Sequence, residues 1–415
     1  MRVASVVKAL LGVEKSIVER VEFEDVGVVV HVRVYKRQQL RCSYCGKRRG
    51  KYDDGRGRRR WRTLDSGTTK VWLEASSPRV RCKDHGVVAA RVPWARAGQT
   101  GYSRVFEDQV SWLAARTTQS VISQLMRITW RSVGKVLTRV VDERRAGVDL
   151  LDQLTRIGID ETSYRRGHRY LTVVVCHDTG RLVWAGVGRN KASIEAFLEE
   201  LGPERRKRLT HVSCDGAEWI HDTIRERCPN AVICLDAFHV VRWAQDAVDE
   251  IRRELWNAER KDGDKQAAKL VKGTRWALLK NPEKLTDKQA ATLKTLEKTN
   301  APLYRAYLLK EQLRELLKQP IDEAIELLDR WLAWASRSRL QPFVKLARTL
   351  RRQRAALEAM IEHRLTNGRV ESVNAKIRVI QQRAFGFHNP HALISLAMLT
   401  LSGLCPPLPG RTTHS

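Results

Sequence analysis

The amino-acid sequence predicts a multidomain α/β protein, in which an all-helical insertion interrupts a central α/β core and two small modules precede that core. Short β-branched runs alternate with helical segments between residues 157 and 235, whereas residues 240–364 are rich in Leu, Ala, Lys, Glu and Arg with helical periodicity. A chain of 415 residues is also long for one core. We place the domains, in chain order, at residues 1–100, 101–150, 151–240 with 365–400, and 241–364, followed by a tail at 401–415.

The charge of the chain predicts a phosphate-rich partner. The sequence has 76 Lys and Arg against 47 Asp and Glu, a formal net charge of +29. One basic run, such as the one that contains Arg58, Arg59 and Arg60, is more often a solvated surface. An excess spread over the whole chain is instead typical of nucleic-acid binding, so we expect double-stranded DNA as partner and these arginines as contacts.

No stretch approaches the roughly 18 to 20 consecutive apolar residues that cross a bilayer, and the N-terminus has no signal-peptide cleavage pattern. We therefore expect a cytoplasmic protein without a membrane partner.

Two short motifs predict a zinc site in the first module. Cys42-Ser-Tyr-Cys45 and Cys82-Lys-Asp-His85 each place two ligand residues three positions apart, and a glycine follows each pair. This set suits tetrahedral Zn²⁺, with His85 as the least secure ligand. We expect residues 68–74 and 79–81 to form a β-hairpin that carries the second pair. The alternative is a set of unrelated buried cysteines, which is the role we expect for the other five.

The second module has the pattern of a helix-turn-helix. Phe106, Val110, Leu113 and Ala114 form one apolar stripe, Ser103 is a candidate N-cap, and a second stripe contains Val121, Ile122, Leu125 and Met126. Thr129 then caps a helix that exposes Trp130, Arg131 and Lys135 for contact with DNA. A plain three-helix bundle would show the same periodicity.

The order of elements after residue 150 is that of an RNase H-like core. We expect a meander of three strands at residues 157–160, 170–177 and 181–187, a helix at 194–201 capped by Ser193, a strand at 209–214, a helix at 218–227 and a strand at 231–235. In such a sheet the first and fourth strands are neighbours, so Asp160 and Asp215 meet at their ends.

Glu371 is predicted to complete this pair from a later helix. Val370, Val373, Ile377 and Ile380 form the packing face of that helix. Glu371, Asn374 and Arg378 lie on another face that can point into the site, where we expect Asn374 to neighbour the acids and Arg378 to contact DNA. Three carboxylates suit a pair of Mg²⁺ or Mn²⁺ ions and phosphodiester chemistry. Glu161 competes with Asp160 for the first position, and Asp236 competes with Asp215 for the second.

Three longer motifs carry a family resemblance. They are Gly158 to Val174, Leu235-Asp-Ala-Phe-His-Val-Val241, and Asn367 to Arg378 together with Arg383-Ala-Phe-Gly-Phe387. At these residues the chain closely resembles bacterial insertion-sequence transposases of the ISL3 family, and the likeness covers nearly the whole chain.

The resemblance implies a DDE triad of Asp160, Asp215 and Glu371, with Asp236 and His239 as active-site neighbours. It also implies binding of terminal inverted repeats by the N-terminal modules and a bacterial, nucleoid-associated protein. Members often complete the zinc site with cysteine, where this chain has His85.

The helical insertion offers two more candidate features. Leu313, Leu317, Ile321, Ile325 and Leu328 form an apolar face that fits either an internal core or another subunit, and Trp276, Trp331 and Trp334 fit either the core or stacking on a flipped base. We predict a transposase that cuts and joins DNA as a homodimer or larger assembly. The alternatives are an inactive DNA-binding repressor and a structure-specific nuclease of the same fold. The repeat sequence, the target site and the excision pathway are not encoded in these motifs.

Overall fold

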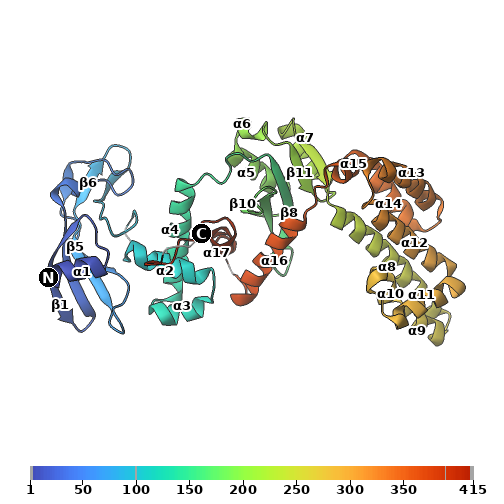
Figure 1. The fold of residues 1–415 in the computed structure, drawn as a ribbon, viewed down its shortest axis with the longest axis horizontal. Coiled ribbons are helices and arrows are strands. Elements are labelled where there is room, and N and C mark those ends of the chain that lie inside the picture. The colour runs from blue at the N-terminus through green and yellow to red at the C-terminus, as the bar shows by residue number, and fades with distance from the viewer. Residues whose placement is uncertain (1–2, 99–100, 388, 412–415) are drawn as a thin grey trace. The chain divides into compact units, whose positions relative to one another are not determined.

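The computed structural model describes residues 3–98, 101–387 and 389–411 (Figure 1). The chain packs as two units, one formed by residues 1–149 with 380–415 and the other by residues 150–379. No helix within the described residues is long and apolar enough to cross a membrane.

The first unit begins with helix α1 (Val3–Leu10) and two small sheets. The four-stranded sheet has the order β1 (Ser16–Glu24), β2 (Gly27–Val34), β5 (Val71–Ser76) and β4 (Arg58–Arg62). The three-stranded sheet has the order β3 (Lys51–Asp53), β6 (Arg79–Cys82) and β7 (Gly86–Ala89), and a short 3₁₀ helix spans Lys36–Gln38.

The predicted hairpin of residues 68–74 and 79–81 is wrong, because these residues belong to different sheets. β5 pairs with β2 and β4, whereas β6 pairs with β3 and β7. Leu73 and its neighbours bury one face in the core of the larger sheet, while Val80 and Cys82 bury theirs in a separate small cluster. The hairpin that carries the second ligand pair is therefore β6–β7, with Cys82 opposite Gly86.

Three helices follow, at α2 (Arg104–Ala114), α3 (Gln119–Met126) and α4 (Trp130–Gly147). The Ser103 and Thr129 side chains accept hydrogen bonds from backbone amides of the first turns, so both predicted caps are confirmed. The second stripe is only half buried: Ile122 and Met126 are in the core, but Val121 and Leu125 are exposed. The eight-residue α3 is too short to bury a broader face.

Helix α17 (Pro390–Leu401) packs against α4 in this unit. Its buried side chains include Leu393, Leu396 and Leu399. Residues 380–400 thus pack with the N-terminal modules, although we expected them in the catalytic domain.

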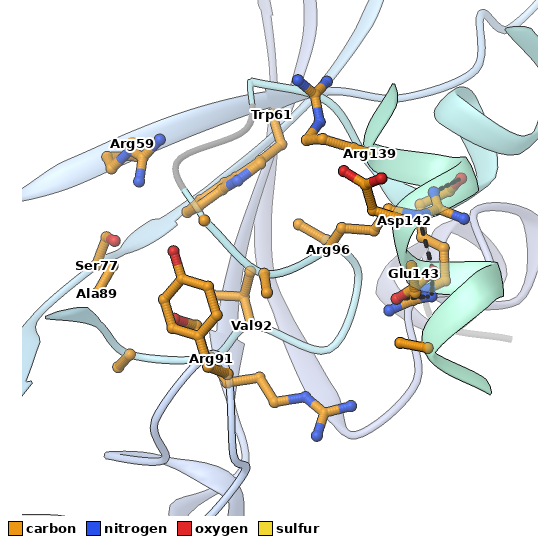
Figure 2. A pocket seen from close by; sticks show the side chains of 18 residues that line it. Arg59, Trp61, Ser77, Ala89, Arg91, Val92, Arg96, Arg139, Asp142 and Glu143 are labelled. Atoms are coloured by element: carbon orange, nitrogen blue, oxygen red, sulfur yellow. Dashed lines mark hydrogen bonds and ion pairs between the residues drawn. The ribbon is translucent and has the colours of Figure 1, made fainter. Parts of the chain in front are cut away.

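A buried charge cluster links the loop before α2 to helices α2 and α4, and Figure 2 shows three of its members, Arg96, Arg139 and Glu143. The Arg96 guanidinium, 3% exposed, donates to Glu107 Oε2 at 3.2 Å and to Glu143 Oε2 at 2.8 Å. Arg139 also donates to Glu107, whose side chain is fully buried. Burial alone would raise the pKa of Glu143, but hydrogen bonds from Arg104 and the charge of Arg96 lower it. Glu143 is therefore ionised at neutral pH.

Glu107→Gln is expected to destabilise this unit by about 3 to 5 kcal/mol, because it leaves two guanidinium groups without their shared buried carboxylate. Urea unfolding followed by a probe in residues 104–147 measures the change. Asp25→Asn, at an exposed position of the same unit, is the matched control. Equal midpoints for the two variants would contradict the expected role of Glu107.

The second unit contains a five-stranded sheet with the order β10 (Leu182–Val187), β9 (Arg169–Cys176), β8 (Arg156–Arg165), β11 (His211–Cys214) and β12 (Val232–Leu235). β8, β9 and β10 form the predicted antiparallel meander, and β11 lies parallel between β8 and β12. Helices α5 (Lys191–Leu201), α6 (Pro203–Arg206) and α7 (Glu218–Arg227) connect the strands.

The predicted cap of α5 is wrong. The helix begins three residues earlier than expected, and Asn190 Oδ1 accepts the amide of Ser193. Ser193 therefore lies in the first turn, where its hydroxyl donates to Val187 O.

The insertion is helical throughout its described length, and its helices share one hydrophobic cluster with the sheet. The elements are α8 (Ala237–Lys261), α9 (Lys265–Gly273), α10 (Arg275–Leu279), a 3₁₀ turn (Pro282–Lys284), α11 (Asp287–Thr299), α12 (Ala301–Leu316), α13 (Ile321–Arg337), α14 (Gln341–Arg352) and α15 (Arg354–His363). Helix α16 (Gly368–Arg383) then returns to the sheet.

The apolar face around Leu313 and Leu328 belongs to the internal core. Trp331 is also core, since its indole is fully buried and donates to Leu309 O at 2.8 Å. Trp334 is partly buried against the same cluster, whereas Trp276 is 58% exposed. Of these three indoles, that of Trp276 is the most exposed, so stacking on a flipped base stays a prediction for this residue.

Candidate functional site

Strand register brings three acids to one edge of the sheet. In the parallel pair of β8 and β11, Gly158 lies opposite Ser213, and Asp160 and Asp215 each follow two residues later. In the parallel pair of β11 and β12, Cys214 lies opposite Leu235, so Asp215 and Asp236 each follow by one residue. The carboxyl ends of parallel strands are where open α/β sheets place their ligands.

Helix α16 is attached to this edge by hydrogen bonds from its own residues and the loop before it. Asn374 Nδ2 donates to Asp160 Oδ2 at 2.7 Å, and the Asn367 amide donates to Asp236 Oδ1 at 3.3 Å. Helix α16 also packs closely against β8, since a Cβ added to Gly158 would lie only 2.4 Å from Val370 Cγ2. Glu371 lies one turn before Asn374, so the same helix presents it beside Asp160.

The Asn367 side chain, just before α16, forms hydrogen bonds with residues of strands β8 and β11. It bonds with the Ser213 hydroxyl, which also lies 2.7 Å from His177 Nε2. Arg369 donates to the His177 backbone oxygen. Burial, assisted by the charges of Arg369 and Arg156, lowers the pKa of His177 to about 4, so this imidazole is neutral and structural.

Burial and neighbouring negative charges raise the pKa values of three of these acids. Burial, with the charges of Asp215 and Asp236, raises the pKa of Asp160. Burial, with the charges of Asp236 and Asp160, also raises that of Glu371. The pKa of Glu161 rises to about 7 through burial and the charge of Asp215. Either protonation or a bound cation reduces the repulsion within such a cluster of carboxylates.

Asp236 and Asp215 differ in how many hydrogen bonds their carboxylate oxygens already accept. Asp236 is 1% exposed, accepts the Phe238 and Asn367 amides, and lies 2.6 Å from His239 Nδ1. That hydrogen bond raises the pKa of His239. Asp215 accepts only the Ala217 amide through Oδ1, and its Oδ2 lies 3.8 Å from Arg189. Asp215 has the freer carboxylate.

Asp160, Asp215 and Glu371 are candidate metal ligands by residue type. Among the described residues, the Cys and His set of the first module is the group whose possible ligand atoms all lie within 4.8 Å of one another, and these three acids do not form such a group. In this cluster, Glu161 Oε1 and Asn374 Oδ1 are buried without a hydrogen-bond partner, which is unfavourable unless a cation or water binds there.

Glu161 is expected to make the metal-free stability of the second unit depend on pH. Its pKa in the fold, about 7, lies above the ordinary value of 4.5, so its ionisation opposes folding as the pH rises between these values. Between pH 5 and pH 8 this one group costs about 3 kcal/mol. Urea unfolding at several pH values should show a flatter profile for Glu161→Gln than for wild type. An unchanged slope, equal to that of the exposed-site control Glu254→Gln, would contradict this.

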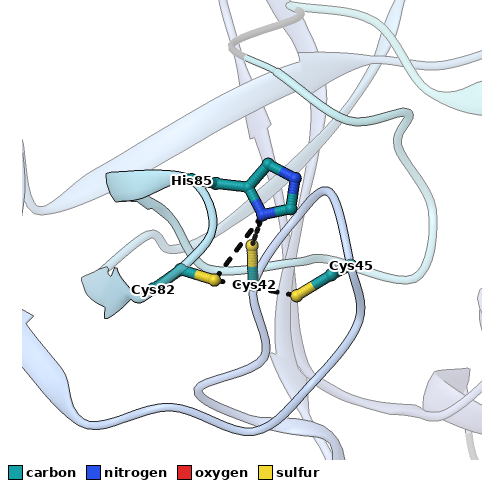
Figure 3. A group of neighbouring side chains, drawn as sticks. All are labelled: Cys42, Cys45, Cys82 and His85. Carbon is teal, nitrogen blue, oxygen red and sulfur yellow. Dashed lines mark hydrogen bonds between the residues drawn. The ribbon is translucent and has the colours of Figure 1, made fainter.

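The zinc ligands predicted from the sequence come together in the first module (Figure 3). Cys45 Sγ and Cys82 Sγ are 3.7 Å apart, and His85 Nδ1 lies 3.6 Å from Cys82 Sγ and 3.8 Å from Cys42 Sγ. A tetrahedral zinc ion with bonds near 2.3 Å to sulfur and 2.0 Å to nitrogen requires edges of about 3.5 to 3.8 Å. The hydrogen bond with His85 lowers the pKa of Cys82 to about 6. This geometry fits Zn²⁺ and includes His85.

The residues predicted to contact DNA lie in different surroundings. Arg58 and Arg60 both donate to Glu74 at 2.7 Å, and Arg60 also pairs with Glu24, so acids compensate these charges. Arg59 lies over the Trp61 ring at the pocket of Figure 2, which has a volume of about 450 Å³.

The other predicted DNA contacts lie on helices. Trp130, Arg131 and Lys135 of α4 line a groove of about 590 Å³ together with side chains that include Phe387 and His391, and no acid lines it within the described residues. Trp130 is 61% exposed. Arg378 is exposed on α16, where its Nε donates to Asn374 O at 3.3 Å.

Comparison with known proteins identifies the chain. Residues 157–397 match an ISL3 family model described as transposase, which covers more than half of the chain. The chain belongs to the ISL3 family of transposases. Residues 38–85 match the zinc-finger model of the transposases of IS204, IS1001, IS1096 and IS1165.

Two relatives are similar in sequence to this transposase over most of its length. The transposase for insertion sequence element IS1557 of Mycobacterium tuberculosis is 47% identical over 440 residues, covering 100% of this chain and 99% of that protein. The transposase for IS1001 of Bordetella parapertussis is 29% identical over 379 residues, covering 90% of this chain and 92% of that protein. The family predicted from the sequence motifs is thereby confirmed.

Sequence reasoning missed some residues of this transposase. Asn367 lies in a quoted motif, but its link to Ser213 depends on a contact across 154 residues. Arg189 follows Gly188 in an ordinary strand-to-helix loop, and no motif singled it out.

Proposed function

We propose that this transposase binds the terminal inverted repeats of its element, cleaves them with divalent metal ions and joins the 3′-hydroxyls to target DNA. The observation that carries the proposal is the strand register that sets Asp160 and Asp215 at one sheet edge, with Glu371 on a helix hydrogen-bonded to Asp160. The strand order, with a meander followed by two parallel strands, supports an RNase H-like sheet. Asp160, Asp215 and Glu371 are then the DDE triad.

The protein residues have separate roles in this proposal. Asp160, Asp215 and Glu371 would hold Mg²⁺ or Mn²⁺, which activate a water or a 3′-hydroxyl and stabilise the leaving oxygen. Asn374 orients Asp160, while Asp236 orients His239 and caps α8. These hydrogen bonds hold the side chains in place before DNA binds.

The N-terminal unit is proposed to recognise the element ends. The zinc module fixes the small sheet, and α3 and α4, joined by a three-residue turn, act as a helix-turn-helix with Trp130, Arg131 and Lys135 on the second helix. Because two ends are processed together, we propose a homodimer or larger assembly on DNA.

A supercoiled plasmid that carries the element's own ends, incubated with the protein and Mg²⁺, tests the proposal. Joined products are expected. Cleavage without joining would indicate a nuclease, and bound but uncut DNA would indicate a repressor. The three acids at one site favour an enzyme over the repressor, and the match to the ISL3 transposases favours strand joining over cleavage alone.

A further inference from the structure

Arg189 is a cation at the edge of the acidic cluster, in the loop between β10 and α5. The cluster itself is formed by Asp160, Glu161, Asp215, Asp236 and Glu371, whose charges act on one another. The Arg189 Nε lies 3.6 Å from Glu161 Oε2, and Nη2 lies 3.8 Å from Asp215 Oδ2. The guanidinium therefore lies beside the proposed metal ligand of the second strand.

The loop holds Arg189 in a defined place. The Gly188 amide donates to Tyr170 O at 2.9 Å, and the Thr172 hydroxyl donates to Gly188 O at 2.9 Å. Gly188 has φ +120°, and a Cβ there would lie 2.5 Å from Ser193 Oγ, so glycine is required. The backbone on both sides of Arg189 is thus attached to the sheet and to α5.

The Arg189 guanidinium keeps its hydrogen-bonding capacity. Both distances to the acids are longer than a hydrogen bond, and within the described part of the chain its other contact is the Tyr170 ring at 5.3 Å. Its side chain is 48% exposed. The backbone of Arg189 is held in place, its guanidinium stacks on an aromatic ring, and its N–H groups remain available. Such an arginine is well suited to a bidentate contact with phosphate.

The negative charge of the acidic cluster explains why a contact between Arg189 and a phosphate would matter. A DNA phosphate that enters a cluster of carboxylates is repelled, and its charge changes further as the phosphodiester bond breaks. We propose that Arg189 donates hydrogen bonds to the non-bridging oxygens of the scissile phosphate and is a catalytic residue of strand cleavage. This inference rests on the proposed function.

Arg189→Gln tests the proposal in the full-length protein with end DNA and Mg²⁺. We expect single-turnover cleavage to slow by about 10²-fold, as for the loss of one charged donor at a reacting oxygen, while Arg189→Lys loses less. End-DNA affinity, measured by fluorescence anisotropy, should change by less than about twofold, because one of many phosphate contacts is lost. The matched control is Arg225→Gln, which removes the same charge from an exposed arginine paired only with Asp222 in the described structure.

A substrate with an uncharged methylphosphonate at the scissile position distinguishes phosphate contact from a structural role. Wild type and Arg189→Gln should differ by less than about fivefold on this DNA, since the charge that Arg189 recognises is absent. An equal difference on both substrates would overturn the proposal and indicate that Arg189 only arranges Glu161 and Asp215. Cleavage by Arg189→Gln within threefold of wild type would overturn it too. Failure of wild type to cut charged DNA would instead overturn the proposed function, and this inference with it.

Discussion

Asp160→Asn is expected to abolish strand cleavage and joining while leaving the binding of end DNA unchanged. The substitution keeps the size of the side chain and an oxygen that can accept the hydrogen bond from Asn374, but it removes the charge that a divalent ion requires. Loss of a metal ligand costs several kcal/mol of transition-state stabilisation, so the rate should fall by at least about 10³-fold. Plasmid cleavage and anisotropy with the same end DNA measure the two effects.

The same variant should be as stable as wild type, or more stable, when metal is absent. Burial and the charges of Asp215 and Asp236 raise the pKa of Asp160, so its ionised form opposes folding at neutral pH and the neutral amide does not. Thermal unfolding without metal checks this, with Asp222→Asn at an exposed position of the same unit as control. A variant that still cuts DNA, or that loses end binding, would contradict the role assigned to Asp160.

The strands themselves could be predicted because side-chain alternation is a local pattern. Alternating and β-branched runs placed β9 to β12 to within two residues, but β8 continues five residues beyond its predicted end at Asp160, to Arg165. That β11 lies beside β8, which places Asp215 near Asp160, was inferred from the order of elements in an RNase H-like sheet. The periodicity of α16 likewise predicted its four buried side chains, Val370, Val373, Ile377 and Ile380. These features need only the side-chain pattern and the direction of each strand.

Other features depend on contacts that no local pattern contains. β5 and β6 look like one hairpin in the sequence, yet each pairs with strands of a different sheet. Asp236 resembles a second catalytic aspartate, but Asn367, 131 residues away, and His239 occupy its oxygens. The packing of α17 on α4 also joins segments far apart in the chain. Each of these depends on which surfaces meet, which single-sequence periodicity does not encode.

Removal of zinc is expected to unfold the three-stranded sheet and leave the four-stranded sheet folded. Among the described residues, the buried core of the small sheet is Cys42, Val80 and Cys82, with Leu40, Cys45, Val88 and Ala90 partly buried against it, and three of these seven are zinc ligands. Burial of a few such side chains gives about 1.5 to 3 kcal/mol each, whereas ordering costs about 1 to 2 kcal/mol per residue. Zinc binding in comparable small modules supplies roughly 10 to 16 kcal/mol, so here metal binding is most of the folding free energy.

Cys45→Ser, or chelation of the wild-type protein, should therefore abolish the hydrogen-exchange protection of β6 and β7 while β5 stays protected. β5 belongs to a separate cluster that includes Trp61, Val71 and Leu73 and contains no zinc ligand. Cys405→Ser is the matched control, because that thiol is partly buried and lies outside the ligand set. If β6 and β7 stayed protected after the loss of metal, the three-stranded sheet would be stable without zinc, in contradiction to the prediction. If β5 also lost protection, the two sheets would be one cooperative unit, in contradiction to their separate cores.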